Sequence, residues 1–130
     1  MNKESKNWLA MVRYDLKTAD QLFKTGRYVY VIFMCHLAVE KSLKAVISWQ
    51  ANQLPPKTHD LIYLTNLTKI EIPKDLLDFA GVINNVAIVT RYPEDLSKLV
   101  SNYPKAVAQK YLMKTKELIK WIIKDLKLRK

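Results

Sequence analysis

A chain of 130 residues has the length of one domain, so we take residues 1–130 as a single unit with one core. The one cysteine, Cys35, excludes an intrachain disulfide and indicates a reducing compartment, which we expect to be the cytoplasm. The formal charge of +10 predicts attraction to phosphates or acidic partners. No signal peptide is expected, and the longest apolar run, residues 28–39, is too short to cross a bilayer.

Apolar residues recur at helical spacing through most of the chain. The first predicted helix ends before Gly26, where a helix C-terminus favours glycine. The second continues to about Gln53, is apolar all round in its first half like a central helix, and is ended by Pro55 and Pro56. The apolar stripe of the first helix consists of Trp8, Val12, Leu16, Ala19 and Phe23.

Three further helices follow in the second half of the chain. Thr58 is the predicted cap of a short one, and Pro73 opens the next, which ends at residues 90–95 because Tyr92 precedes a proline. The last begins near Pro104. The sequence therefore predicts an all-α, up-and-down helical bundle of about five helices. The buried stripes expected in the last two are Leu76, Phe79, Ile83 and Ala87, and Val107, Tyr111, Leu118, Ile122 and Leu126.

Residues typical of enzymes are sparse. The chain has no Gly-rich phosphate loop, no HExxH and no CxxC, and two histidines are too few to hold a metal alone, so we expect neither metal nor cofactor. Cys35 lies in an apolar run and is expected to be unreactive, because thiolates form at exposed electropositive sites. His36 is expected to be a hydrogen-bonded core histidine.

Three charged residues interrupt the apolar second helix. Glu40 and Lys44 have the i, i+4 spacing of a helix-surface ion pair, which contributes about 0.2–0.5 kcal/mol. Lys41 lies about 100° further round the helix, where its stem can cover apolar surface. From spacing alone, a structural role for the three charges is the favoured interpretation.

Three segments together resemble the HEPN domain family, over Leu9 to Leu126. They are "GRYVYVIFMCHLAVEKSLKAVI", "PKTHDLIYL" and "TRYPED". The resemblance implies a helical bundle that commonly forms homodimers, often encoded in prokaryotes beside a minimal nucleotidyltransferase. Some members of the family are ribonucleases, in which an arginine is followed four to six residues later by a histidine at the dimer interface.

The nuclease pattern is incomplete in this sequence. Arg91 matches the family arginine, but no histidine follows it, and RNA cleavage needs a group that moves a proton. We therefore predict no catalytic residue and expect a cytoplasmic, prokaryotic, non-catalytic member. It would bind a nucleotide or a nucleotidyltransferase partner, with cations meeting phosphate and Tyr92 stacking on a base or closing the pocket. The predicted polar site consists of Lys41, Lys44, His59, Arg91 and Tyr92.

Alternatives remain open from the residues. Glu40 and Lys41 could instead orient the segment at Arg91 by charge pairing, and a toxin-type ribonuclease could use Arg91 with an unusual partner. A basic RNA-binding module could use the lysines of the last helix, although exposed aromatics do not alternate with them. A homodimer is expected because the second helix has more apolar surface than a small bundle covers. The lysines expected to give weak polyanion binding are Lys116, Lys120, Lys124 and Lys127.

Overall fold

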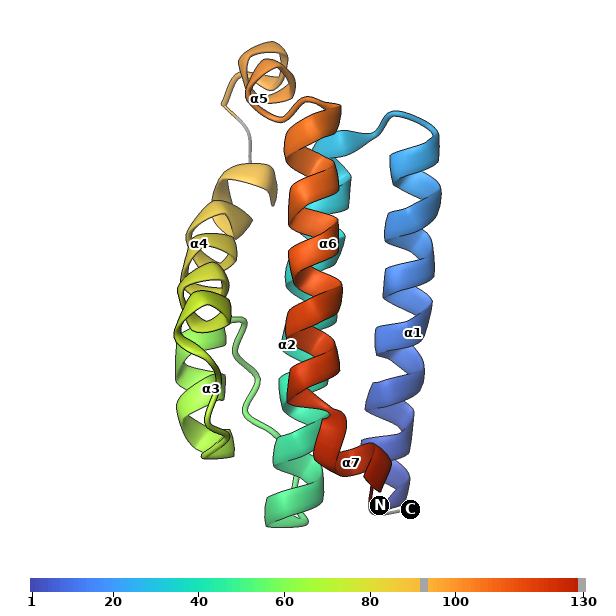
Figure 1. The fold of residues 1–130 in the computed structure, drawn as a ribbon, viewed down its shortest axis with the longest axis vertical. Helices are drawn as coiled ribbons and strands as arrows, with labels where there is room; N and C mark the ends of the chain where they lie inside the picture. The colour runs from blue at the N-terminus through green and yellow to red at the C-terminus, as the bar shows by residue number, and fades with distance from the viewer. Residues whose placement is uncertain (92–93, 129–130) are drawn as a thin grey trace.

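The computed structural model describes residues 1–91 and 94–128, with 88–91 and 127–128 described as backbone alone. Figure 1 shows a bundle of long helices joined by short connections, with α5 at one end. Seven helices lie within the described residues, two more than the sequence suggested. Their bounds are α1 Lys3–Lys24, α2 Tyr28–Ala51, α3 Leu61–Thr68, α4 Lys74–Arg91, α5 Leu96–Asn102, α6 Lys105–Ile122 and α7 Lys124–Leu128.

The central helix is α2, as its all-round apolar first half predicted. It packs against α1, α6, α3, α4 and α5, and Val31, Ile32 and Cys35 are fully buried. Most residues of the predicted stripes of the other helices are buried in the core or packed against it. The bundle itself therefore covers most of the apolar surface that suggested a second copy, although Tyr30 remains exposed.

Three sequence predictions about boundaries need correction. The cap of α3 is Asp60 and not Thr58, because the Asp60 carboxylate accepts hydrogen bonds from the Ile62 and Tyr63 amides. The short helix α5, capped by Asp95, was not expected. The last predicted helix is broken at Ile123, so Lys124 begins α7 and does not continue the lysine stripe of α6.

The core contains the single cysteine, as its place in an apolar run indicated. Cys35 is buried, and burial raises the pKa of its thiol to about 12. Almost no thiolate would exist at neutral pH, which argues against a nucleophilic role. In the described part of the chain, no helix combines the length and apolar character needed to cross a membrane.

Candidate functional site

The most connected polar group near the predicted site is the Glu40 carboxylate, which α2 places in the protein interior. Lys44 Nζ donates to Glu40 Oε2 at 2.9 Å, and the two side chains are only 8% and 5% exposed. The predicted i, i+4 pair therefore forms, but it is buried and not at the helix surface. Lys44 also lies over the Trp8 ring, 5.6 Å from its centroid, so α1 helps to enclose the cation.

His59 approaches the same carboxylate from the loop between α2 and α3. Its Nδ1–H donates to Glu40 Oε1 at 2.8 Å, while its side chain is 63% exposed. Because the donor must be Nδ1–H, the Nε2 atom of a neutral His59 carries the lone pair. The arrangement presents an oriented imidazole at the surface, held by a buried acid.

His36 fixes the backbone of the same loop residue. Its Nε2–H donates to the His59 carbonyl oxygen at 3.0 Å, and its Nδ1 lies 4.0 Å from Glu40 Oε1. His36 is buried, which agrees with the hydrogen-bonded core histidine expected from the sequence. Two buried side chains, one turn apart on α2, thus hold the backbone and the ring of His59.

Lys41 lies outside this cluster. Its Nζ donates to Asp15 Oδ2 of α1 at 2.7 Å, and both side chains are largely buried. This contact links α1 to α2 and neutralises the lysine charge. The sequence did not identify Asp15, because 26 positions separate it from Lys41 and no local pattern connects them.

The N-terminus of α3, beside His59, is already occupied by the protein's own groups. Asn84 Oδ1 of α4 accepts from the Leu61 amide at 2.9 Å, and Asp60 accepts from the next two amides. The free amides that attract a phosphate to a helix N-terminus are therefore used internally here. A phosphate near His59 would have to be bound by side chains.

The remaining predicted residues fall at the edge of what is described. Arg91 is the last residue of α4, with its backbone alone described, and Tyr92 lies outside the described residues. The structure thus joins His59 and Lys44 through Glu40 and directs Lys41 elsewhere. Among the described residues, no group of three or more His, Cys, Asp or Glu side chains could hold a metal ion.

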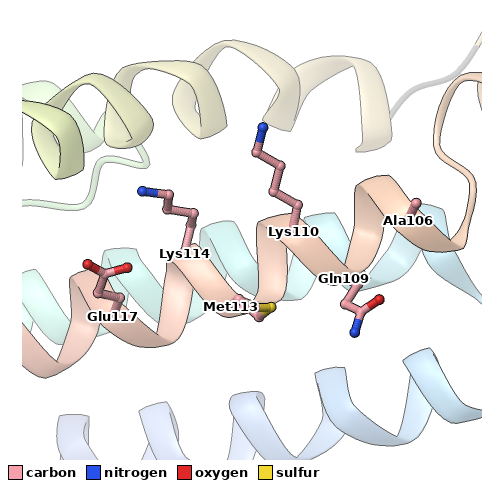
Figure 2. Close-up of a pocket in the computed structure, with 6 residues that line it drawn as sticks. All are labelled: Ala106, Gln109, Lys110, Met113, Lys114 and Glu117. Carbon is pink, nitrogen blue, oxygen red and sulfur yellow. The ribbon is translucent and has the colours of Figure 1, made fainter.

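A shallow hollow of about 260 Å³ lies on α6, away from this cluster. All six of its lining residues belong to that one helix, so it lacks the opposing walls of a nucleotide pocket. Figure 2 shows Lys110 and Lys114 extending toward α4, with Gln109 directed toward α1. Lys114 Nζ is 3.8 Å from Asp75 Oδ2 of α4.

Comparisons with known proteins agree with this architecture. The family model described as "HEPN domain" matches residues 5–126. Protein TT1696 from Thermus thermophilus is 23% identical, with a TM-score of 0.81 over 95% of this chain and 98% of that one. ST0689, described as an archaeal HEPN homologue, is 18% identical, with a TM-score of 0.74 over 96% and 98%. None of the curated proteins matches the sequence.

Proposed function

Because the chain belongs to the HEPN domain family, we propose that it is a non-catalytic member that acts by binding a minimal nucleotidyltransferase. One observation carries the preference for a protein partner over a nucleotide. The two lysines expected to meet phosphate are each bound to a carboxylate, Lys41 to Asp15 and Lys44 to Glu40. Withdrawing Lys44 from Glu40 would leave a buried charge unpaired, which costs about 3–5 kcal/mol.

The surface beside His59 suits a protein partner. Helix α3 follows this residue and exposes Tyr63 and Leu67, one turn apart on its outer side. Protein interfaces are enriched in tyrosine and have an apolar centre with polar groups around it. The oriented His59 ring would supply a polar contact at the edge of this α3 patch, defined by Tyr63 and Leu67.

Calorimetry with a minimal nucleotidyltransferase as the partner tests the proposal. The double variant Tyr63→Ala, Leu67→Ala should weaken binding at least tenfold. Truncating an aromatic residue that a partner buries in the interface costs more than about 1.4 kcal/mol of binding free energy. Tyr14→Ala is the matched control, since Tyr14 is exposed on α1 and should leave the affinity unchanged. Equal affinities of wild type and the double variant would exclude the α3 patch as the binding surface. No binding by wild type would refute the proposal.

Nucleotide binding is the second candidate, and the exposed, oriented His59 ring favours it. The predicted site of Lys41, Lys44, His59, Arg91 and Tyr92 would then require the two lysines to leave Asp15 and Glu40 and meet phosphate instead. Titration with ATP should then give heat that is lost in both His59→Ala and Arg91→Ala. Incubating the same preparation with RNA tests the ribonuclease alternative, because cleavage abolished by Arg91→Ala would replace both binding proposals.

We also propose a prokaryotic protein that forms homodimers, as the family resemblance implies, and a cytoplasmic one, as the single cysteine indicates. Light scattering tests the assembly directly. A species of about twice 15.2 kDa is expected at micromolar concentration, and a monomer throughout that range would refute the dimer.

A further inference from the structure

The outer surface where α1 and α6 meet concentrates positive charge. Lys116 Nζ of α6 donates to Asp20 Oδ1 of α1 at 2.8 Å, and Lys105 of α6 lies over the Phe23 ring of α1 at 6.0 Å from its centroid. These contacts hold the two helices side by side, as Figure 1 shows. They also identify which side of each helix faces the other.

Helical spacing places further cations on those same sides. Counted from Asp20, Arg13 is seven residues back and Lys24 four residues on, within about 40° of it around the helix. Counted from Lys116, Lys120 is four residues on, again within about 40°. We name this surface the α1/α6 face. Its exposed cations are Lys6, Arg13, Lys17, Lys24, Lys105, Lys116 and Lys120.

The positive charge of this face is not balanced locally. Lys116 already binds Asp20, and the exposed Glu117 of α6 stands one residue after Lys116 and three before Lys120, so two carboxylates lie near seven cations. Within the described part of the chain, Lys6, Arg13 and Lys17 have no ion pair. On α4, by contrast, Asp75 and Asp78 each lie within 4 Å of a lysine nitrogen. The α1/α6 face therefore has charge available for an anionic partner.

We propose that the α1/α6 face binds a nucleic acid through its phosphate backbone, without reading sequence. The cations on α1 extend from Lys6 to Lys24, about 27 Å along the helix, which spans several phosphates. Large exposed apolar residues on the outer surfaces of these two helices are few, Tyr14 on α1 and Met113 on α6. Protein interfaces are depleted in lysine and need an apolar centre, whereas nucleic-acid interfaces are polar and strongly positive.

This inference goes beyond the proposed partner and does not depend on it. In Figure 1, α3 and α1 lie on opposite sides of α2, so the α3 patch and the α1/α6 face are separate surfaces. Substitutions on one surface should leave binding at the other unchanged. The two proposals can therefore fail independently.

Fluorescence anisotropy with a labelled single-stranded RNA oligonucleotide tests the proposal between about 50 and about 200 mM salt. The face variant carries Lys6→Gln, Arg13→Gln, Lys17→Gln and Lys120→Gln. Each lost phosphate contact lowers the salt slope by about 0.7, so four lower it by about 2.8. Between the two salt concentrations, wild type should therefore lose up to about 50-fold more affinity than the face variant.

The matched control removes four lysines from elsewhere, through Lys57→Gln, Lys69→Gln, Lys74→Gln and Lys98→Gln. Both variants lose the same formal charge, so only the face variant should change the slope, and circular dichroism should show both folded. An equal decrease of the salt slope in the two variants would show a general effect of charge and overturn the proposal. An unchanged slope in the face variant would overturn it too. Equally tight binding of wild type to polyglutamate or anionic vesicles would refute the assignment to nucleic acid.

Discussion

The burial of the Glu40–Lys44 pair makes the stability of this protein depend on both partners together. Glu40→Ala leaves the Lys44 ammonium, only 8% exposed, without its carboxylate, and also removes the acceptor for His59. Breaking one side of a buried pair typically costs about 3–5 kcal/mol. We expect this loss for Glu40→Ala, and for Lys44→Ala, in the free energy of unfolding.

A double substitution separates the charge effect from packing. In Glu40→Leu, Lys44→Met neither charge is buried, and apolar groups of similar size fill the space, so the loss should be far smaller than the sum of the single losses. His59 would still lose its acceptor, but its ring is largely exposed and can bind water. Urea unfolding followed by circular dichroism measures all three variants.

The chain contains its own control for burial. Lys74 and Asp78 of α4 have the same i, i+4 spacing, but their side chains are 92% and 67% exposed and the atoms are 3.9 Å apart. Asp78→Ala should cost less than about 0.5 kcal/mol. If Glu40→Ala cost no more than Asp78→Ala, or if the double variant were as unstable as the single ones, the reasoning from burial would be refuted.

Two further predictions concern Cys35 and the cap of α3. Burial raises the pKa of the Cys35 thiol from 9.0 to about 12, so between these pH values the folded state keeps a proton that the unfolded state loses. The contribution of this thiol to the free energy of unfolding is therefore complete below pH 9 and is lost as the pH rises toward 12. Measured by urea unfolding between these pH values, the free energy of unfolding should decline less for Cys35→Ala than for wild type. An equal decline in the two proteins would contradict the raised pKa. Asp60→Ala should cost about 1 kcal/mol, because two α3 amides lose their acceptor. Thr58→Ala, which removes an acceptor for the Asp60 amide alone, should cost less in the same urea assay, and the reverse order would restore Thr58 as the cap.

Properties that repeat along one helix could be read from the sequence. The apolar stripes and the Glu40–Lys44 contact follow from a period of 3.6 residues, which fixes the direction of each side chain around the helix axis. The central position of α2 follows from its first half being apolar on all sides. The burial of Cys35 and the hydrogen bonding of His36 followed from their place in an apolar run. The short helices α5 and α7 have too few turns for a period to show, so they were missed.

Contacts between distant segments were decided by the tertiary structure. The sequence identified Glu40, Lys41, Lys44 and His59 as polar residues of interest, but it could not show that His59 turns back onto Glu40. Their contact depends on how the loop after Pro55 and Pro56 returns along α2.

The ion-pair partner of each charged side chain, and the α1/α6 face as a whole, were also decided by the tertiary structure. Periodicity places a residue around its own helix, but which neighbour lies there depends on packing and chain return. Asp15 reaches Lys41, and Asp20 reaches Lys116 across 96 positions, because α2 and α6 pack against α1. The sequence identified the lysines of the last helix. It could not show that they form one surface with the cations of α1, because that depends on the packing of α6 against α1.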